Sequence, residues 1–213
     1  MAVPTISTRL SAVNTILRCI NEAPVSTLTP PPTDDVQMAM DVLDETSVET
    51  MSKGWSFNVE ADVELVLDID GKYAVPADVL RIVLDRPRST LALVMRDDAG
   101  TLRLYNKAKN QHTFILPVGL KATLIRLVDF EATPEVFRRY VTIRSARAFQ
   151  ARLQGASASA YSERDEMIAM SHLRADEGQV EPRTMYDSWA AFRVIDRRYP
   201  NLGGAGGAFF GGT

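Results

Sequence analysis

The hydrophobic pattern of the N-terminal quarter predicts two helices. Over residues 7–21, apolar side chains recur every three or four residues, which is the period of an amphipathic helix. A second such stretch begins near Asp34 and Asp35, whose charges favour a helix N-terminus, and Gly54 is expected to end it. Its predicted apolar positions are Val36, Met40, Leu43, Val48 and Met51. The proline-rich loop at 21–33 cannot continue either helix, so the two should form an antiparallel pair.

From Trp55 onwards, hydrophobic and polar residues alternate with a period of two, which is typical of half-buried strands. The alternation is clear at 55–59 and again at 63–69, and residues 97–100 read as a turn. Further short strands are expected at 79–84, 91–95, 102–105, 113–116 and 122–127. Many short strands with turns every few residues favour a sandwich-like or barrel-like all-β domain. We assign this domain to residues 55–128.

The helical period returns after Thr133. Thr133 is expected to act as an N-cap and Pro134 to occupy the first helical position of a helix that runs to Gln154. A fourth helix is expected at 158–177, with Gly178 at its end. Its predicted apolar positions are Ala160, Tyr161, Met167, Ile168 and Leu173.

The order of these elements predicts an α+β fold. Two helices precede the β domain and two follow it, so residues 1–54 and 129–178 should form a discontinuous four-helix bundle. The β domain is then an insertion between the second and third helices, at a place where the ends of the insertion lie close together.

Residues 179–213 differ from the rest and predict an extended C-terminal docking arm. Tyr186, Trp189 and Phe192 recur at three-residue spacing. Phe209 and Phe210 follow within a glycine-rich stretch that cannot repay the entropy of ordering itself alone. Aromatic side chains are frequent anchors in protein interfaces, so we expect the arm to dock on a partner.

Composition narrows the possible classes of protein. The 213 residues carry a formal net charge of −3, which argues against a general nucleic-acid binder. One cysteine, Cys19, excludes an internal disulfide and any zinc site that needs several cysteines. There is no apolar run long enough to span a membrane, and residues 1–10 lack the apolar core of a secretion signal. We therefore expect the chain to be made in the cytoplasm of the cell that produces it.

No arrangement of residues predicts catalysis, a cofactor or a metal. The two histidines, His112 and His172, have no nucleophile motif to serve. Glu163, Asp165 and Glu166 form the densest acidic cluster, and a solvated helix face explains them better than a glycosidase pair. A glycosidase pair would make the protein a hydrolase acting on cell-wall glycans, and this stays a hypothesis beside those given below. No phosphate-binding loop occurs, because the glycine-rich stretch lacks a lysine and a following helix.

The third predicted helix carries an unusual charge. It has five arginines and one acid, Glu135, in a net-acidic chain. The arginines are Arg138, Arg139, Arg144, Arg147 and Arg152. They could pair with acidic faces within or between subunits, for example with Glu163 and Glu166, or they could contact DNA phosphates. We favour ion pairs, and a DNA-binding or packaging module is the alternative.

Six short motifs then occur in the order found in a known family. They are LSAVNTIL at 10–17, APVSTL at 23–28, SKGWSFNVE at 52–60, LIRLVDF at 124–130, TPE at 133–135 and ARAFQ at 146–150. The motif at 52–60 is the most specific of them. In their joint order and spacing, they resemble the podovirus tail tubular protein A family.

The resemblance implies a structural virion protein without catalytic residues: the head-to-tail adaptor, or gatekeeper, of a short-tailed phage. Members of the family form a dodecameric ring beneath the portal protein and join it to the tail nozzle protein, tail tubular protein B. Tail fibres attach near this junction, and the genome DNA passes through the ring during ejection without specific binding. The implied location is the virion tail, after synthesis in the host cytoplasm.

Together, the charge and aromatic patterns predict a set of partner-binding residues. They are Arg138, Arg139, Arg144, Arg147, Tyr186, Trp189, Phe192, Phe209 and Phe210.

Overall fold

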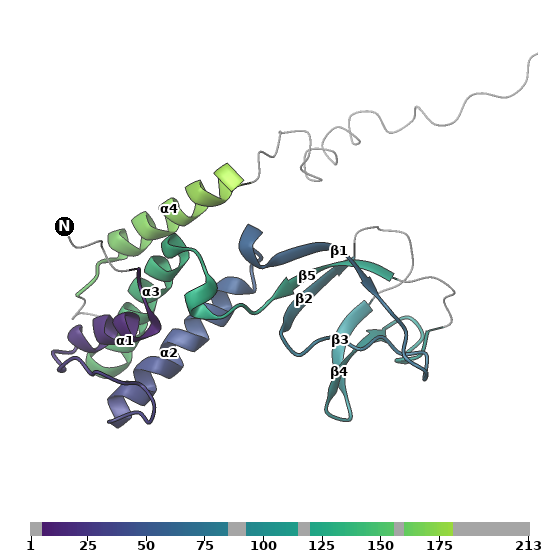
Figure 1. The fold of residues 1–213 in the computed structure, drawn as a ribbon, viewed down its shortest axis with the longest axis horizontal. Helices are drawn as coiled ribbons and strands as arrows, with labels where there is room; N and C mark the ends of the chain where they lie inside the picture. Colours follow the sequence, from purple (N-terminus) through teal and green to yellow (C-terminus); the bar gives the residue numbers. More distant parts are fainter. Residues whose placement is uncertain (1–5, 85–92, 115–119, 156–159, 181–213) are drawn as a thin grey trace, which may run out of the picture. The chain divides into compact units, whose positions relative to one another are not determined.

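A computed structural model describes residues 6–84, 93–114, 120–155 and 160–180. The chain divides into two compact units, Met1–Glu177 and Gly178–Thr213, and the architecture below belongs to the first. Its described residues form an α+β fold with four α-helices and two small antiparallel sheets, as predicted (Figure 1). The aromatic residues predicted for the C-terminal arm lie outside the described residues.

The first two helices begin at threonine caps. Helix α1 (Arg9–Arg18) starts after Thr8, whose side chain accepts a hydrogen bond from the Ser11 amide. The Ser11 hydroxyl in turn accepts a hydrogen bond from the Thr8 amide, which completes a capping box. Helix α2 (Asp34–Met51) starts after Thr33, whose side chain accepts a hydrogen bond from the Val36 amide. The predicted first helix was too long at its end, because Asn21 adopts a left-handed backbone with φ 64°.

The predicted apolar face of α2 was wrong at one position. Val48 is 39% exposed, whereas the polar residues Thr46, Ser47 and Thr50 are buried. The Ser47 hydroxyl donates to the Leu43 carbonyl at 2.7 Å, so this buried hydroxyl has a hydrogen-bond partner in the backbone of its own helix.

The β region forms two sheets. In the first, the antiparallel order is β1 (Val59–Leu65), β5 (Leu120–Arg126) and β2 (Val79–Leu84). The second is a hairpin of β3 (Leu93–Asp98) and β4 (Thr101–Asn106). Apolar residues of both sheets share one buried cluster, which includes Leu65, Val79, Leu104, Ala122 and Leu124.

Local geometry in the β region confirms one predicted turn and corrects two predicted strands. Ala99 and Gly100 both have positive φ, 53° and 81°, as a two-residue hairpin turn requires. The alternation at 55–59 begins instead with a 3-10 turn, η1 (Ser56–Asn58), because Asn58 accepts a hydrogen bond from the Trp55 amide. A strand was also expected at 113–116. In the described part of this range, Thr113 forms an isolated bridge with Lys72.

The last two helices follow a second 3-10 turn, η2 (Phe130–Ala132). Helix α3 (Glu135–Gln154) ends before Gly155, as predicted, but Thr133 is not its N-cap. The Thr133 hydroxyl donates to the Phe130 carbonyl at 2.7 Å, which closes η2, and Pro134 precedes the helix instead.

Helix α4 (Glu163–Val180) starts later than predicted and continues through Gly178. Ser162 and Asp165 exchange hydrogen bonds at its start, which is a capping arrangement. Its buried residues are Ala169 and Leu173, while Met167 and Ile168 are 62% and 44% exposed. The predicted apolar face was wrong there because α4 touches the other helices along a narrow strip.

Helices α1, α2 and α3 pack on one another, and α4 lies beside α3 (Figure 1). Their core contains Ile16, Leu17, Leu43, Phe137 and Phe149, all at most 1% exposed. Near its C-terminal end, α4 is also bonded to η1. The Glu177 carboxylate accepts hydrogen bonds from the Ser56 amide and hydroxyl at 2.8 and 2.9 Å.

A candidate assembly surface on the third and fourth helices

Three arginines of α3 are held by carboxylates of neighbouring helices. The Arg144 guanidinium donates to both oxygens of Glu49 on α2, at 2.6 and 2.9 Å. Arg147 pairs with Glu166 on α4, and Arg152 pairs with Glu45 on α2 at 2.7 Å. The arginines of this helix therefore form ion pairs with both α2 and α4, in addition to the apolar core that the helices share.

Glu166 is shared between two of these arginines. In addition to its pair with Arg147, it lies 3.8 Å from Arg144. Partial burial lowers the pKa of Arg144, but its hydrogen bond to the Tyr140 hydroxyl and the charges of Glu49 and Glu166 raise that pKa overall. The predicted pairing of the arginine-rich helix with Glu166 is thus confirmed within one chain.

Arg138 has a different role. It is 9% exposed, and its guanidinium donates to the Ser7 carbonyl at 2.9 Å and lies 3.5 Å from the Glu135 carboxylate. The Glu135 carboxylate also accepts hydrogen bonds from the Ser7 amide and hydroxyl. Arg138 therefore attaches the segment before α1 to the start of α3.

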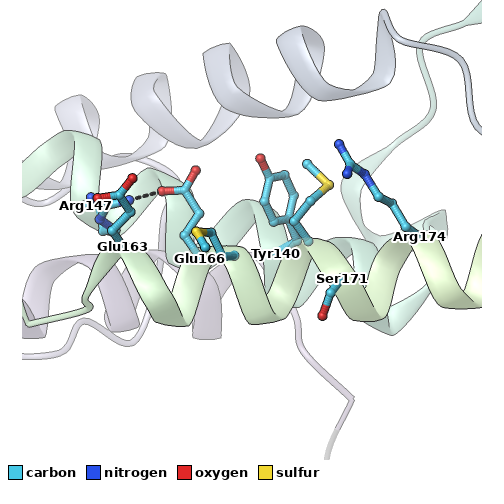
Figure 2. A pocket seen from close by; sticks show the side chains of 8 residues that line it. Tyr140, Arg147, Glu163, Glu166, Ser171 and Arg174 are labelled. Atoms are coloured by element: carbon cyan, nitrogen blue, oxygen red, sulfur yellow. Dashed lines mark hydrogen bonds and ion pairs between the residues drawn. The ribbon is translucent and has the colours of Figure 1, made fainter.

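An open groove of about 590 Å³ runs between α3 and α4. Figure 2 shows Arg147, Glu163 and Glu166 at one end, Arg174 at the other and Tyr140 between them, whereas Ser171 points away. Met167 and Met170 add apolar area to the groove. Because methionine is unbranched and adaptable, such a groove suits a protein side chain of irregular shape.

Arg139 is exposed and lies in a second groove, between α1 and α4, which we call the Arg139 groove. Two adjoining parts, of about 140 and 240 Å³, share Arg139, Ile143 and Tyr161. Ser11 and Thr15 of α1 line the first part, and Ile168 and His172 of α4 line the second. Of the four predicted partner-binding arginines, Arg139 is the one without an acidic partner among the described residues.

The structure thus separates the predicted arginines into two groups. Arg144 and Arg147 lie together at the α3–α4 contact, and Arg138 and Arg139 lie nearer α1. Glu45 and Glu49 were not among the partners predicted from the sequence. The sequence did contain an indication of this pairing. Helix α2 has six acidic residues and no basic one, so its charge is opposite to that of the arginine-rich α3.

The histidines have ordinary surroundings. Nδ1 of His112 lies 3.1 Å from the Leu104 carbonyl, and the ring of His112 packs edge-on against Tyr105. Within the described ranges, no group of three or more His, Cys, Asp or Glu side chains is placed to hold a metal ion. None of the helices that the structure describes combines the length and hydropathy that crossing a lipid bilayer requires.

The grooves combine arginine with methionine, tyrosine and isoleucine side chains, and arginine, methionine and aromatic residues are enriched in protein interfaces, so the class that the structure favours is a protein that assembles with other proteins. Comparison with known families agrees with that class. The family model for tail tubular proteins matches residues 10–182, and the chain belongs to this family. It is a structural component of a phage tail, where it assembles with other tail proteins. A search of the curated proteins found no match.

Proposed function

We propose that this protein is the adaptor that joins the portal to the tail nozzle in a short-tailed phage. In this proposal it forms a dodecameric ring, the genome DNA passes through the ring, and a tail fibre attaches nearby. The family match over residues 10–182 carries the proposal, together with six motifs that follow the order of the tail tubular protein A family.

The structure supports this proposal through the placement of its charges. A ring subunit needs two different surfaces that meet when neighbours are related by a rotation. The ion pairs of Arg144, Arg147 and Arg152 connect α3 with α2 and α4, the helices that would carry such surfaces. The same pairs weigh against the DNA-binding alternative, since arginines held by carboxylates are not available for phosphates.

In this proposal the chain has the three parts predicted from the sequence. Residues 1–54 and 129–178 would form the helical part of the ring, 55–128 the inserted β domain, and 179–213 the arm. Tyr186, Trp189, Phe192, Phe209 and Phe210 would contact the portal or a neighbouring subunit.

The test is native mass spectrometry of the protein mixed with the portal of the same phage. We expect a dodecameric layer to add to the portal, at both low and high salt. If no association occurs at any salt concentration, the adaptor proposal is wrong. A steep loss of DNA affinity with increasing salt would then favour the DNA-binding alternative.

Two truncated chains serve as matched variants in that experiment. Ending the chain after Val180, where α4 ends, should leave a protein that still unfolds cooperatively but no longer joins the portal. Ending it after Asn201 keeps Tyr186, Trp189 and Phe192 and removes the glycine-rich stretch, so a chain that still joins would assign the contact to the first aromatic group. Normal incorporation of the shorter chain would contradict a docking role for the arm.

A further inference from the structure

The Arg139 groove offers a cation to a partner. Arg139 is exposed at the surface of α3, and its guanidinium has no acidic partner among the described residues. One carboxylate lines the groove, that of Asp165, but it accepts hydrogen bonds from the amide and hydroxyl of Ser162 at 2.8 and 2.7 Å. These hydrogen bonds lower the pKa of Asp165 and keep its carboxylate in the helix cap.

The groove also offers apolar area next to that cation. Ile168 is 44% exposed and lines the groove together with Ile143 and Tyr161. The exposed side chain of Ile168 leaves apolar area in contact with water in the same groove as Arg139. Protein interfaces have an apolar core and are enriched in arginine, so a partner protein would cover this area favourably. The groove thus suits an acidic segment that also carries an apolar side chain.

The outward face of α2 has that chemistry. Asp34, Gln37, Met38 and Asp41 are exposed along one side of its first half, and we call them the α2 acidic face. Met38 is 40% exposed, between the two aspartates. Further along α2, the carboxylates are already paired: Asp44 with Arg9, Glu45 with Arg152 and Glu49 with Arg144. Asp34 and Asp41 have no cationic partner within the described part of the chain. The Asp41 carboxylate accepts one hydrogen bond, from the side-chain amide of Gln37 at 2.7 Å, which leaves its negative charge unpaired.

These two complementary surfaces belong to different parts of one helical body. The residues that line the Arg139 groove come from α1, α3, α4 and the segments just before α1 and α4, and none comes from α2. From the complementary charge we infer that the α2 acidic face of one copy docks in the Arg139 groove of a neighbouring copy, with Asp41 facing Arg139 and Met38 against Ile168. This inference rests on the proposed ring and names the surfaces that join its subunits.

The contact is heterologous, because each copy contributes two different surfaces. Such contacts repeat from copy to copy and close into a ring when the rotation allows. DNA is a poorer occupant of the groove, since Arg139 is the one arginine or lysine among the residues that line it and phosphate binding needs several cations together.

Disulfide cross-linking between full-length chains tests the contact directly. Met38→Cys and Ile168→Cys are made as two separate proteins and mixed under mild oxidation. The native thiol, Cys19, is 8% exposed and interferes little. We expect the mixture to give on the order of tenfold more heterodimer than a control mixture of Met38→Cys and Val83→Cys, because the partner surfaces hold the two thiols together.

The control matches the test in exposure, because Val83 in β2 is 44% exposed, as Ile168 is. Equal heterodimer yields in the two mixtures would overturn the inference. So would faster dimerisation of Ile168→Cys with itself, since that result indicates a symmetric contact.

A charge swap identifies the residue pair. Arg139→Glu in the Ile168→Cys chain should lower the heterodimer yield on the order of tenfold, and Asp41→Arg in the Met38→Cys chain should restore it, because opposite charges face each other again. Arg174→Glu is the matched control: Arg174 is exposed on α4 and lines the groove between α3 and α4 instead of the Arg139 groove, so this change should leave the yield unaltered. Failure of Asp41→Arg to restore the yield would contradict the assigned pair.

The inference and the proposed function fail differently. If the portal acquires its layer of this protein but the 38–168 cross-link is absent, the interface is wrong and the adaptor function stands. If neither the layer nor the cross-link forms, both are wrong.

Discussion

Replacing Asn58 with alanine is expected to lower the free energy of unfolding by roughly 2–5 kcal/mol, because it removes three hydrogen bonds of one buried side chain at once. The side chain is 2% exposed. Its oxygen accepts from the Trp55 amide at 2.8 Å, and its nitrogen donates to the carbonyls of Met51 at 3.0 Å and Arg126 at 2.7 Å. Asn58 thereby connects the end of α2, the turn η1 and the end of β5.

Most of this loss comes from backbone groups left without a partner. The Met51 carbonyl also accepts a hydrogen bond from the Gly54 amide, so that carbonyl loses least. Urea denaturation followed by circular dichroism measures the effect. Asn58→Asp is the informative control, because aspartate keeps the acceptor for Trp55 but sets an oxygen against the two carbonyls, and it should be at least as unstable as the alanine variant. A loss below about 1 kcal/mol for both variants would contradict this role for Asn58.

Replacing Phe137 with alanine is expected to cost roughly 3–5 kcal/mol of stability, which is typical of removing a fully buried aromatic side chain. Phe137 is 0% exposed and lies in the helical core. Its ring packs edge-on against Phe57, with ring centroids 4.9 Å apart. The substitution therefore leaves a cavity between α3 and the start of the β region.

A graded pair of variants separates cavity formation from other causes. Phe137→Leu keeps most of the side-chain volume and should cost about 1–2 kcal/mol, which is clearly less than the effect of alanine. The measurement is again the free energy of unfolding in urea. Equal losses for leucine and alanine would show that the volume of this side chain is not what stabilises the core.

Stability outside the core depends on pairs of charges that can be removed without a cavity. Glu166→Ala takes the carboxylate away from Arg144 and Arg147 and should cost about 1 kcal/mol at low salt and less at high salt, because the pairs are partly exposed and therefore screened. Glu163→Ala is the matched control on the same helix, since Glu163 is exposed and forms no ion pair with the described residues. Thermal unfolding at two salt concentrations distinguishes them, and equal shifts would contradict a shared role for Glu166.

The motif at 52–60 illustrates why some sequence patterns are specific. Gly54 has φ 83°, and a Cβ added there would lie 2.8 Å from Cδ1 of Ile125, so larger residues meet both strain and a clash. Trp55 donates its ring N–H to the Thr50 carbonyl at 2.8 Å. Gly54, Trp55 and Asn58 of the motif thus have specific structural roles at the junction between α2 and the β region.

The sequence by itself determined the kinds of element and much of their order. Hydrophobic period, prolines and caps are local properties, so they predicted the start of α2, the extent of β2 and the end of α3 correctly. Predictions based on a single side chain were less secure. The Thr133 hydroxyl donates to the Phe130 carbonyl instead of capping α3. The apolar residues Met167 and Ile168 of α4 are largely exposed.

Only the tertiary structure decided which residues meet. The charge of α3 was evident from the sequence, but its partners Glu45 and Glu49 lie about a hundred residues earlier, and no local pattern specifies such a pairing. The same holds for Arg139: five arginines on one helix look alike in the sequence, and the packing of α1, α2 and α4 around α3 leaves this one exposed in a groove. Local propensities act over a few residues, whereas the availability of a charge depends on everything that packs around it.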